Sequence, residues 1–511
     1  NAPDDDGPVR IVLEAKVAEA ATAGMSAAAV EQLRDLLMEF RDVFRLKFGR
    51  DPPVKVEPLK VCLKEGAVPV KSGLRRYPPT HMAFLEKHVR ELEEAGLVYR
   101  NTRSRWASAP RIVPKKDPGD LRMTIDSRPI NACTEPMPWP MPNLEVAMVV
   151  LKGSKVYFKL DWMKGGCDPT RVLMGQTDAV AYCQGVVDEF FGDLLMHGLL
   201  GWLDDLLGYA QTTDELLHLL RKVLEICHAY GLKLHPGKCV FYTTRTVWCG
   251  KEISADGVAH APERIQGLCD LGPPQTAADL QQFLCATNWM RGNIPQYTEL
   301  VAPLTKLLDI AAKAADSRKK TALTRVALSS VGWSGDHLEC FDRIKETLKR
   351  MVPLSHPDPD KMVCLYTDAS EGFWGAVATQ VPVEDLALPA SDQRHEPLAF
   401  LSGSFRGASG RWPIVEKEAF AVVESCKRLE YLLIRPGGFR LFTDHRNLVY
   451  MFNPLGSNSN MAKYQAHKLQ RWALTMATFP YVVECVAGEE NLWADRLVVG
   501  EVLPDRTGAF W

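Results

Sequence analysis

Two short apolar runs enclose an acidic pair in the middle of the chain, and this feature constrains the fold more than any other. The runs are "LLGWL" and "LLGYA", and Asp204 and Asp205 lie between them. Apolar runs of this length are typical of buried strands, and a polar pair between two such runs predicts a turn. The segment therefore predicts a hairpin that carries two carboxylates at its tip.

A third carboxylate decides how this acidic pair is interpreted. Asp is common in hairpin turns for conformational reasons alone, so the pair by itself indicates only structure. Asp161, however, ends the run "KVYFKLD", which predicts another short buried strand. Three carboxylates at neighbouring strand ends would repel one another unless divalent cations neutralised them. Because Mg²⁺ binds a few carboxylates together with substrate phosphates, the cluster predicts phosphoryl-transfer chemistry.

A second hairpin is predicted nearer the N-terminus. The stretches "SAPRIVPKK" and "LRMTID" flank the turn "DPGD", with Lys115 and Arg122 on opposite arms. One interpretation of these cations is a solvated surface turn. Beside a two-metal site they would instead bind a nucleoside triphosphate, because Arg is suited to bidentate contact with phosphate.

Three helices are expected in the first half of the chain. One covers "SAAAVEQLRDLLMEF" after an acidic tail, and another runs from about Asp214 to Tyr230 and ends at Gly231. The third, from Thr80 to Gly96, has Thr80 as its cap and an apolar face formed by Met82, Leu85, Val89 and Leu92.

The second half predicts a helical region followed by an α/β domain. Residues from about 259 to 310 are rich in Leu and Ala, and the polar passage "AADSRKKTALTRVALSS" after them predicts a linker. A new domain is expected from about Trp333, with strands over "MVCLYTDAS", "GFWGAVATQ" and "FRLFTDH" and a helix from about Val415 to Leu433. A lone Asp at a strand end is usually a cap, but four carboxylates in apolar surroundings predict a second two-metal site: Asp368, Glu418, Asp444 and Asp495.

Length and composition set the outer limits of these expectations. A chain of 511 residues has room for three or four domains. Its formal net charge of -2 means that nucleic-acid binding must rely on local clusters of Lys and Arg.

The 13 Cys residues form no CxxC pair, which speaks against a zinc module and a secreted disulfide framework and favours a reducing intracellular compartment. No apolar run reaches bilayer length, and the chain begins with Asn1 in place of Met, which suggests a fragment or processed product.

The ordered motifs resemble gypsy-class reverse transcriptases of LTR retrotransposons with their attached ribonuclease H, over about residues 35 to 500. In the first part the resemblance is carried by "GLVYRNTRSRWASAPRIVPKKDPGDLRMTIDSRPIN", "YFKLDWMKGG", "MGQTDAVAYCQ", "WLDDLLGYA", "GLKLHPGKC" and "VWCGKEISADG". In the second part it is carried by "LQQFLCATNWMRGNIPQYTELVAPLTKLL", "YTDASEGFWGAVATQ", "VEKEAFAVV", "FTDHRNL" and "GEENLWADRL".

This resemblance implies a multidomain α/β and α+β fold: a right-hand polymerase with fingers, palm and thumb, a connection, and an RNase H-like α/β domain. The domains implied are an N-terminal tail and lead-in helix (1–70), fingers and palm (71–258), thumb, connection and linker (259–332), the RNase H-like domain (333–500) and a C-terminal tail (501–511). The activities implied are RNA-directed DNA synthesis and cleavage of the RNA strand of an RNA/DNA hybrid.

The resemblance also assigns roles to single residues. It implies that Lys115 and Arg122 contact the triphosphate, that Gly175 and Gln176 lie near the incoming nucleotide, and that Lys238 donates a proton to pyrophosphate. The implied catalytic residues and metal ligands are Asp161, Asp204 and Asp205 in the polymerase and Asp368, Glu418, Asp444 and Asp495 in the nuclease. Each site would hold two Mg²⁺ ions, for which Mn²⁺ could substitute. The implied partners are an RNA template, a DNA primer, an RNA/DNA hybrid and dNTPs, with no membrane, in a cytoplasmic retroelement particle that can reach the nucleus.

One departure from the family pattern concerns the polymerase pocket. Only 14 positions separate Asp161 from Gly175 (175 minus 161), an interval in which the family has a strand, a turn and a fingers-side hairpin. Gly166 also stands where the family has an aromatic residue that selects the sugar. Two alternatives to a complete reverse transcriptase therefore stay open. One is a copy in which only hybrid cleavage survives, and the other is a catalytically inactive relic that binds nucleic acid.

Overall fold

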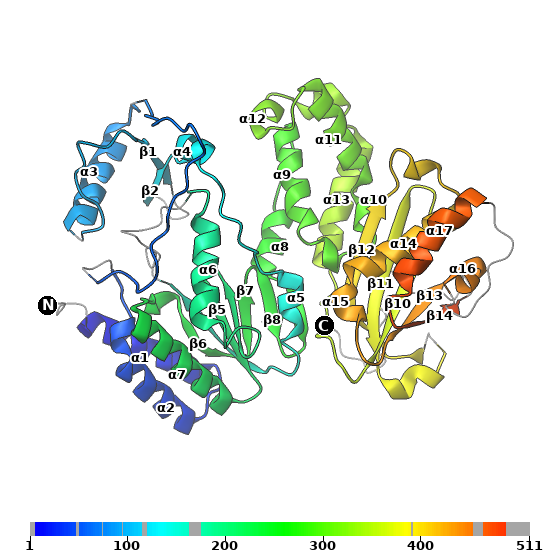
Figure 1. Ribbon diagram of the computed structural model, residues 1–511, viewed down its shortest axis with the longest axis horizontal. Coiled ribbons are helices and arrows are strands. Elements are labelled where there is room, and N and C mark those ends of the chain that lie inside the picture. The colour runs from blue at the N-terminus through cyan, green and yellow to red at the C-terminus, as the bar shows by residue number, and fades with distance from the viewer. Residues whose placement is uncertain are drawn as a thin grey trace. The chain divides into compact units, whose positions relative to one another are not determined.

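The computed structural model describes most of the chain as two compact units, residues 1–249 and 250–511 (Figure 1). The described residues are 6–47, 51–73, 75–94, 96–114, 120–162, 175–389, 392–452 and 463–486. Within them, no helix combines the length and apolar character needed to cross a membrane.

A four-stranded antiparallel sheet forms the centre of the first unit. Its strand order is β4–β5–β3–β6, with bounds β3 Val156–Asp161, β4 Leu199–Trp202, β5 Asp205–Ala210 and β6 Val240–Thr243. The strands expected around Asp161, Asp204 and Asp205 are thus confirmed. Helix α7 (Thr213–Tyr230), also expected, packs against β3 and β5, while α6 (Ala179–Phe191), which was not predicted, packs against β4.

The N-terminal segment folds onto this sheet, contrary to expectation. Residues 6–22, which were expected to belong to an acidic tail, form helix α1 (Asp6–Thr22). Val9, Leu13 and Val17 recur at helical spacing, and all three are buried in the same core as Phe158. The expected helix over the next segment is confirmed as α2 (Ala27–Glu39). The tail prediction was wrong because the acidic start of the chain masked this apolar spacing.

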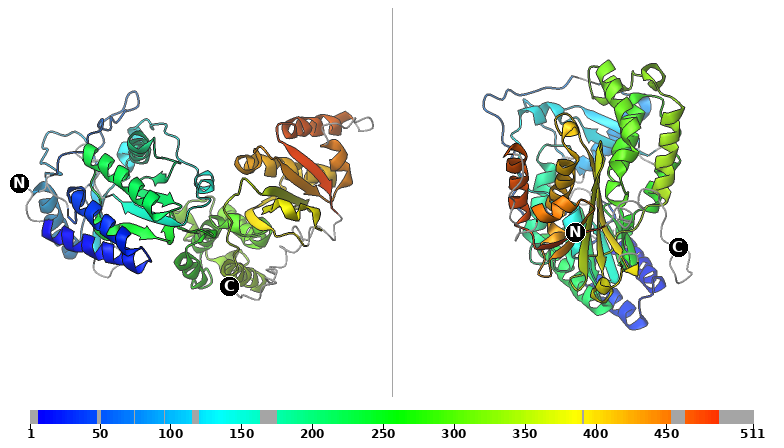
Figure 2. Two further views of the ribbon diagram at one scale, coloured as in Figure 1. Left: turned by 90° about the horizontal axis from the view of Figure 1, so that it is seen from below. Right: turned by 90° about the vertical axis from the view of Figure 1, so that its right-hand side faces the viewer.

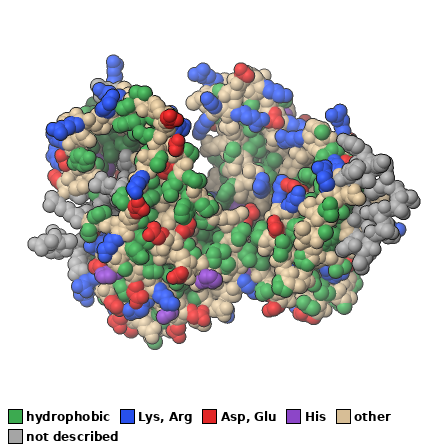
Figure 3. Space-filling view, viewed as in Figure 1, with side chains coloured by type: hydrophobic (Ala, Val, Ile, Leu, Met, Phe, Trp, Pro, Cys, Tyr) green, Lys and Arg blue, Asp and Glu red, His purple; other side chains and the backbone are tan. Residues whose placement is uncertain are grey.

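The predicted hairpin near the N-terminus is confirmed as β1 (Pro110–Pro114) paired antiparallel with β2 (Leu121–Ile125). Helix α3 (Pro79–Glu94) is also confirmed, but its apolar face is largely open: Met82 and Val89 are each 42% exposed, and only Leu85 is buried. Lys and Arg side chains are numerous over this part of the unit (Figure 3). The remaining elements of the first unit are α4 Arg128–Cys133, α5 Leu144–Val149 and β7 Arg245–Trp248.

The second unit begins with a short hairpin and a helical core. The bounds are β8 Lys251–Ser254, β9 Gly257–His260, α8 Pro262–Cys269, α9 Ala277–Asn288, α10 Tyr297–Leu300, α11 Ala302–Ala314, α12 Lys320–Leu323 and α13 Gly335–Lys349. The passage expected as a linker is part of this core, because Leu323 of α12 and Leu328 are almost completely buried in it. The linker prediction was wrong because a few apolar anchors outweigh the polar residues around them. The four boundaries expected between domains stay predictions, although α13 packs in the same helical core.

A five-stranded mixed sheet forms the rest of the second unit, in the order β12–β11–β10–β13–β14. The bounds are β10 Met362–Ala369, β11 Phe373–Val381, β12 Glu396–Ser404, β13 Phe439–Thr443 and β14 Tyr481–Cys485. Strands β10, β11 and β12 are antiparallel, whereas β10, β13 and β14 are parallel. Helices α14 (Ile414–Arg428) and α17 (Lys463–Met476) lie on one face of the sheet (Figure 2). The helix expected from about Val415 to Leu433 is broken at Leu429 into α14 and α15 (Glu430–Leu433), and α16 covers Arg446–Met451.

Candidate active sites

The first site lies at one end of the sheet of the first unit, where Asp161 is the last residue of β3 and Asp205 the first of β5. The two residues face each other as cross-strand partners, so their side chains lie on the same face of the sheet. Asp204 lies in the turn before β5, and its carbonyl accepts a hydrogen bond from the Trp162 N–H at 3.1 Å. The fold therefore places all three predicted carboxylates at one sheet end.

Two lysines partly neutralise these carboxylates. Lys238 donates to Asp161 with 2.9 Å between Nζ and Oδ1, and the Lys159 Nζ lies 3.8 Å from the Asp205 Oδ1. Burial raises the pKa of Asp205, the charges of Asp204 and Asp161 raise it further, and the two lysines oppose this shift. The site thus concentrates more negative charge than its own cations balance, which is the condition that favours a divalent cation.

A buried glutamine that the sequence analysis missed holds the acidic turn. Gln184, on α6, is completely buried, and its Oε1 accepts a hydrogen bond from the Leu203 N–H at 3.1 Å. Leu203 has φ 56°, in the left-handed region that L-residues with large side chains rarely adopt. Gln184 also donates to Asp188 at 3.0 Å. The sequence signal that could have indicated Gln184 is a polar residue on an otherwise apolar helix face.

The residues expected to bind the nucleotide are only partly described. Arg122 lies on β2 opposite Val113 with its side chain exposed, whereas Lys115 lies outside the described residues. Gly175 has φ 99°, and its carbonyl accepts a hydrogen bond from the Asn131 side chain at 2.8 Å. Gln176 is the next residue and is half-buried. Gly166 and the rest of residues 163–174 lie outside the described residues as well.

The second site lies at the carboxyl ends of two adjacent parallel strands, β10 and β13. Asp368 is the last residue but one of β10, and Asp444 directly follows β13. Because Tyr366 and Phe442 are register partners, the two carboxylates occupy equivalent positions two residues further along neighbouring strands. The parallel pairing therefore brings together two residues that are distant in the sequence.

Glu418 of α14 completes this group from the face of the sheet. It is 3% exposed, and its Oε1 accepts a hydrogen bond from the Ala369 N–H at 3.1 Å. Its Oε2 is buried and has no hydrogen-bond partner among the described residues. Burial, together with the charges of Asp368 and Asp444, raises the pKa of Glu418 to about 8. A buried carboxylate oxygen without a partner, beside two further carboxylates, has the donor chemistry of a Mg²⁺ ligand.

Asp495, the fourth carboxylate predicted here, lies outside the described residues. Among the residues that the structure describes, no three His, Cys, Asp or Glu side chains are positioned to hold a metal ion together. The metal-ligand assignments therefore stay predictions, supported by the chemistry of the Glu418 oxygen.

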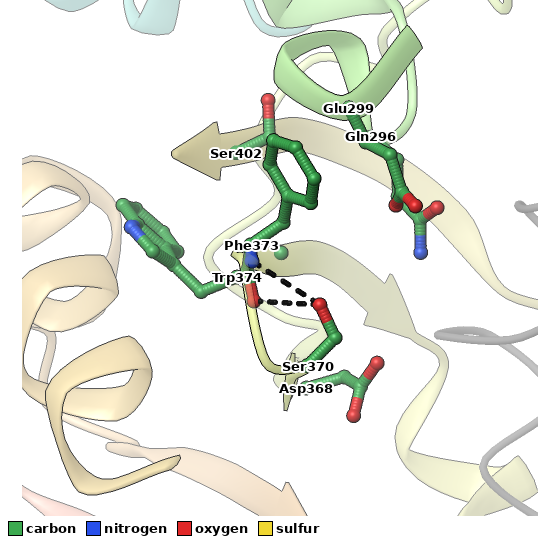
Figure 4. A pocket seen from close by; sticks show the side chains of 8 residues that line it. Gln296, Glu299, Asp368, Ser370, Phe373, Trp374 and Ser402 are labelled. Carbon is green, nitrogen blue, oxygen red and sulfur yellow. Dashed lines mark hydrogen bonds between the residues drawn. The ribbon is translucent and has the colours of Figure 1, made fainter. Parts of the chain in front are cut away.

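A groove adjoins the second site. Asp368, Ser370 and Phe373 line one part of it, and Gln296, Glu299 and Ser402 line another (Figure 4). The side chains of Gln296 and Glu299 extend from the segment around α10 toward this groove (Figure 4). The wall that they form is a second feature that the motifs did not predict.

Comparisons with known proteins relate the chain to reverse transcriptases. Residues 358–479 match the model of the RNase H-like domain found in reverse transcriptase. The transposon Tf2-3 and Tf2-7 polyproteins of Schizosaccharomyces pombe are each 25% identical over 502 residues. These alignments cover 93% of this chain, and the chain spans only 35% of each polyprotein.

Solved structures share the fold of most of the chain. The foamy viral protease-reverse transcriptase in complex with dsDNA superposes with a TM-score of 0.75 at 17% identity, covering 94% of this chain and 98% of that one. The same protein in complex with an RNA/DNA hybrid gives a TM-score of 0.71 at 16% identity, covering 93% of this chain and 63% of that one. The chain thus has the mixed α/β fold of reverse transcriptases, with an RNase H-like domain, and resembles the corresponding region of transposon polyproteins.

Proposed function

We propose that the chain is the reverse transcriptase and ribonuclease H portion of a gypsy-class LTR retrotransposon polyprotein, and that its nuclease site is active. The observation that carries the proposal is the position of Glu418. Its buried Oε2 has no hydrogen-bond partner among the described residues, and burial together with Asp368 and Asp444 raises its pKa. Burying a carboxylate in this state lowers the stability of the fold, so its presence indicates a functional role.

In the proposed nuclease, Asp368, Glu418 and Asp444 hold two Mg²⁺ ions, and Asp495 completes the set. The ions, when bound, lower the pKa of the attacking water and stabilise the charge that develops on the scissile phosphate. The Ala369 N–H fixes Glu418 through its Oε1 and leaves the other oxygen for a ligand. The substrate is the RNA strand of an RNA/DNA hybrid, distinguished from DNA by its 2′-hydroxyl.

In the proposed polymerase, Asp161, Asp204 and Asp205 would hold two divalent cations, which would supply activation of the primer 3′-hydroxyl and neutralisation of the charge on pyrophosphate. Lys238 must then release Asp161, to which it donates at 2.9 Å, and becomes available to protonate the pyrophosphate. We assign the triphosphate to Lys115 and Arg122, and the neighbourhood of the incoming nucleotide to Gly175 and Gln176. The template is held mainly through its backbone, so binding should weaken steeply with salt.

The proposed partners are an RNA template, a DNA primer, their hybrid and dNTPs. The exposed cations around α3, β1 and β2 offer a surface for such polyanions despite the formal net charge of -2: Arg75, Arg76, Arg90, Arg100, Arg103, Arg105 and Arg111. We assign the chain to a cytoplasmic retroelement particle with access to the nucleus.

Two narrower functions compete with this proposal. In one, polymerisation is lost and hybrid cleavage remains, which the short interval from Asp161 to Gly175 favours. In the other, the chain is an inactive relic that binds nucleic acid. The charged group around Glu418 argues against the relic, because a carboxylate without a function would be readily replaced by an apolar residue at a buried position.

The test is cleavage of a labelled RNA/DNA hybrid by the full chain in Mg²⁺, compared with Asp444→Asn and with an all-DNA duplex. We expect cleavage of the hybrid alone and loss of nearly all activity in the variant, because removal of one ligand leaves the others with misplaced metal. Asp342→Asn, an exposed position on α13, is the matched control and should cleave normally. A folded parent that does not cleave, or equal cleavage by Asp444→Asn, would favour the relic.

A further inference from the structure

Three cross-strand partners form a row that starts at the proposed nuclease site. Asp368 on β10 is paired with Gly375 on β11, and Gly375 is paired with Ser402 on β12. Paired positions on adjacent strands present the same face, so the row runs across the sheet for about two strand spacings, roughly 10 Å. Gly375 has no side chain, so the middle of the row is open and forms the floor of a groove.

The start of α10 is fixed to the far end of this row. Ser402 Oγ accepts a hydrogen bond from the Thr298 N–H at 3.0 Å and lies 2.9 Å from the Thr298 hydroxyl. Gln296 extends over the floor, because a Cβ placed on Gly375 would lie 3.8 Å from its Cγ. Gln296 also has φ 45°, a left-handed conformation that costs energy in a residue other than Gly or Asn. The docking of Thr298 thus holds Gln296 in a fixed and strained position.

The groove between this segment and Asp368 contains polar groups that have no role in the fold. Its empty volume is about 280 Å³, part of it open to solvent. Neither the Gln296 amide nor the Glu299 carboxylate makes a side-chain hydrogen bond or ion pair with the described residues, although both line the groove (Figure 4).

We propose that Gln296 and Glu299 are positioning residues that bind a ribose of the RNA strand beside the cleaved bond. The inference rests on the proposed function, because it takes Asp368 as the residue next to the scissile phosphate. A sugar within one or two nucleotides of that phosphate on the same strand would reach the groove. The helical segment before the RNase H-like domain would thus contribute directly to substrate recognition by the nuclease.

The chemistry of the two side chains selects a ribose over other ligands. A 2′-hydroxyl is both a donor and an acceptor, and deoxyribose offers neither. The Glu299 carboxylate is an acceptor only, and the Gln296 amide can donate and accept, so together they match one hydroxyl group. A bare phosphate would be repelled by Glu299, which argues against a site for the phosphodiester itself.

The test combines side-chain removal with removal of single 2′-hydroxyls. The full chain, Gln296→Gly and Glu299→Ala are each given RNA/DNA hybrids with one deoxyribose at successive positions around the cleavage site, and kcat/KM is measured. In the parent, one position should lower kcat/KM by roughly 2- to 160-fold, a range that runs from one neutral hydrogen bond to one hydrogen bond with a charged group. In each variant the unmodified hybrid should lose a similar factor, and deoxyribose at that position should cause no further loss.

Two controls separate this role from a structural one. Gln296→Gly relieves the left-handed strain, so the variant should be at least as stable as the parent in thermal unfolding. Gln282→Ala, at an exposed glutamine of α9, should leave both kcat/KM and the deoxyribose profile unchanged.

The inference would be overturned if the loss from the side-chain change and the loss from the deoxyribose multiplied at every position. It would also be overturned if the variants cleaved the hybrid and discriminated against deoxyribose as the parent does. Either result would leave the nuclease proposal intact. Failure of the folded parent to cleave any hybrid would instead overturn the proposed function itself.

Discussion

At the scale of single residues, Glu418 is the group with the clearest electrostatic consequence. Its pKa is raised from 4.5 to about 8 by burial and by Asp368 and Asp444. Without divalent cations, the folded chain keeps a proton that the unfolded chain releases between these pH values. Stability is therefore expected to fall as the pH rises from about 4.5 to about 8, because the folded state then binds more protons than the unfolded state.

The measurement is the urea midpoint of the second unit's transition in EDTA, at pH 5 and at pH 8. Glu418→Gln should remove most of the difference between the two midpoints, because its amide does not titrate. Glu339→Gln, an exposed carboxylate on α13, should keep the dependence of the parent. If the midpoint of Glu418→Gln changed with pH as the parent's does, Glu418 would ionise normally.

A second prediction at this scale concerns Arg122. If its exposed guanidinium contacts the triphosphate, Arg122→Ala should weaken dNTP binding by about 1.5 to 3 kcal/mol, the range for a hydrogen bond to a charged group. Binding can be followed with a fluorescent dNTP analogue on a primed template. Arg10→Ala removes an exposed arginine from α1 and serves as the control. If the affinity for dNTP were unchanged in Arg122→Ala, Arg122 would be interpreted as part of a solvated surface turn.

At the scale of elements, local pattern explains which predictions succeeded. The strands ending in Asp161 and flanking Asp204 and Asp205 were predictable, because buried strands need consecutive apolar residues and these runs are short and sharply bounded. Helix α1 was missed because the charge of the first residues outweighed the spacing of Val9 and Leu13. The position of Gln296 beside Asp368 could not be predicted at all, since it depends on tertiary docking through Thr298.

Gln184 gives the next prediction, because it connects helix α6 to the acidic turn. Gln184→Leu keeps the size of the side chain but leaves the Leu203 N–H without its acceptor. The expected cost is about 1 to 3 kcal/mol, the penalty for an unsatisfied buried donor. Urea unfolding of the first unit measures it, and Gln211→Leu, at the exposed end of β5, is the control. A variant as stable as the parent would show that the turn does not need this bond.

The passage that was expected to be a linker gives the next prediction, which compares the cost of removing a leucine side chain at a buried and at an exposed position. Leu323 is completely buried in the helical core, so Leu323→Ala should destabilise the second unit by about 2 to 5 kcal/mol. Leu338 is 37% exposed on α13, and Leu338→Ala should cost much less. Equal midpoints for the two variants in urea unfolding would restore the linker interpretation.

At the scale of the whole molecule, the sequence indicated where the described carboxylates lie better than it indicated their surroundings. Each carboxylate could be found because it stands in an apolar run, and the family resemblance then gave its role. The supporting residues were not found in this way, because Gln184 and Gln296 look like ordinary polar residues until the fold shows what they contact. The two activities of the chain are therefore best tested separately.

The last prediction compares these two activities in one preparation of the full chain. Hybrid cleavage should be readily measured in Mg²⁺, whereas primer extension on an RNA template should be weak or absent. The expected reason is the short interval from Asp161 to Gly175. At about 3.3 Å per residue this interval can connect the two motifs, but it has too few residues for the strand and hairpin that the family resemblance implies. Inserting a family-like segment after Gly165 should raise extension and leave cleavage unchanged. Robust extension by the parent, abolished by Asp204→Asn, would show instead that Gly166 and this interval still form a working nucleotide pocket.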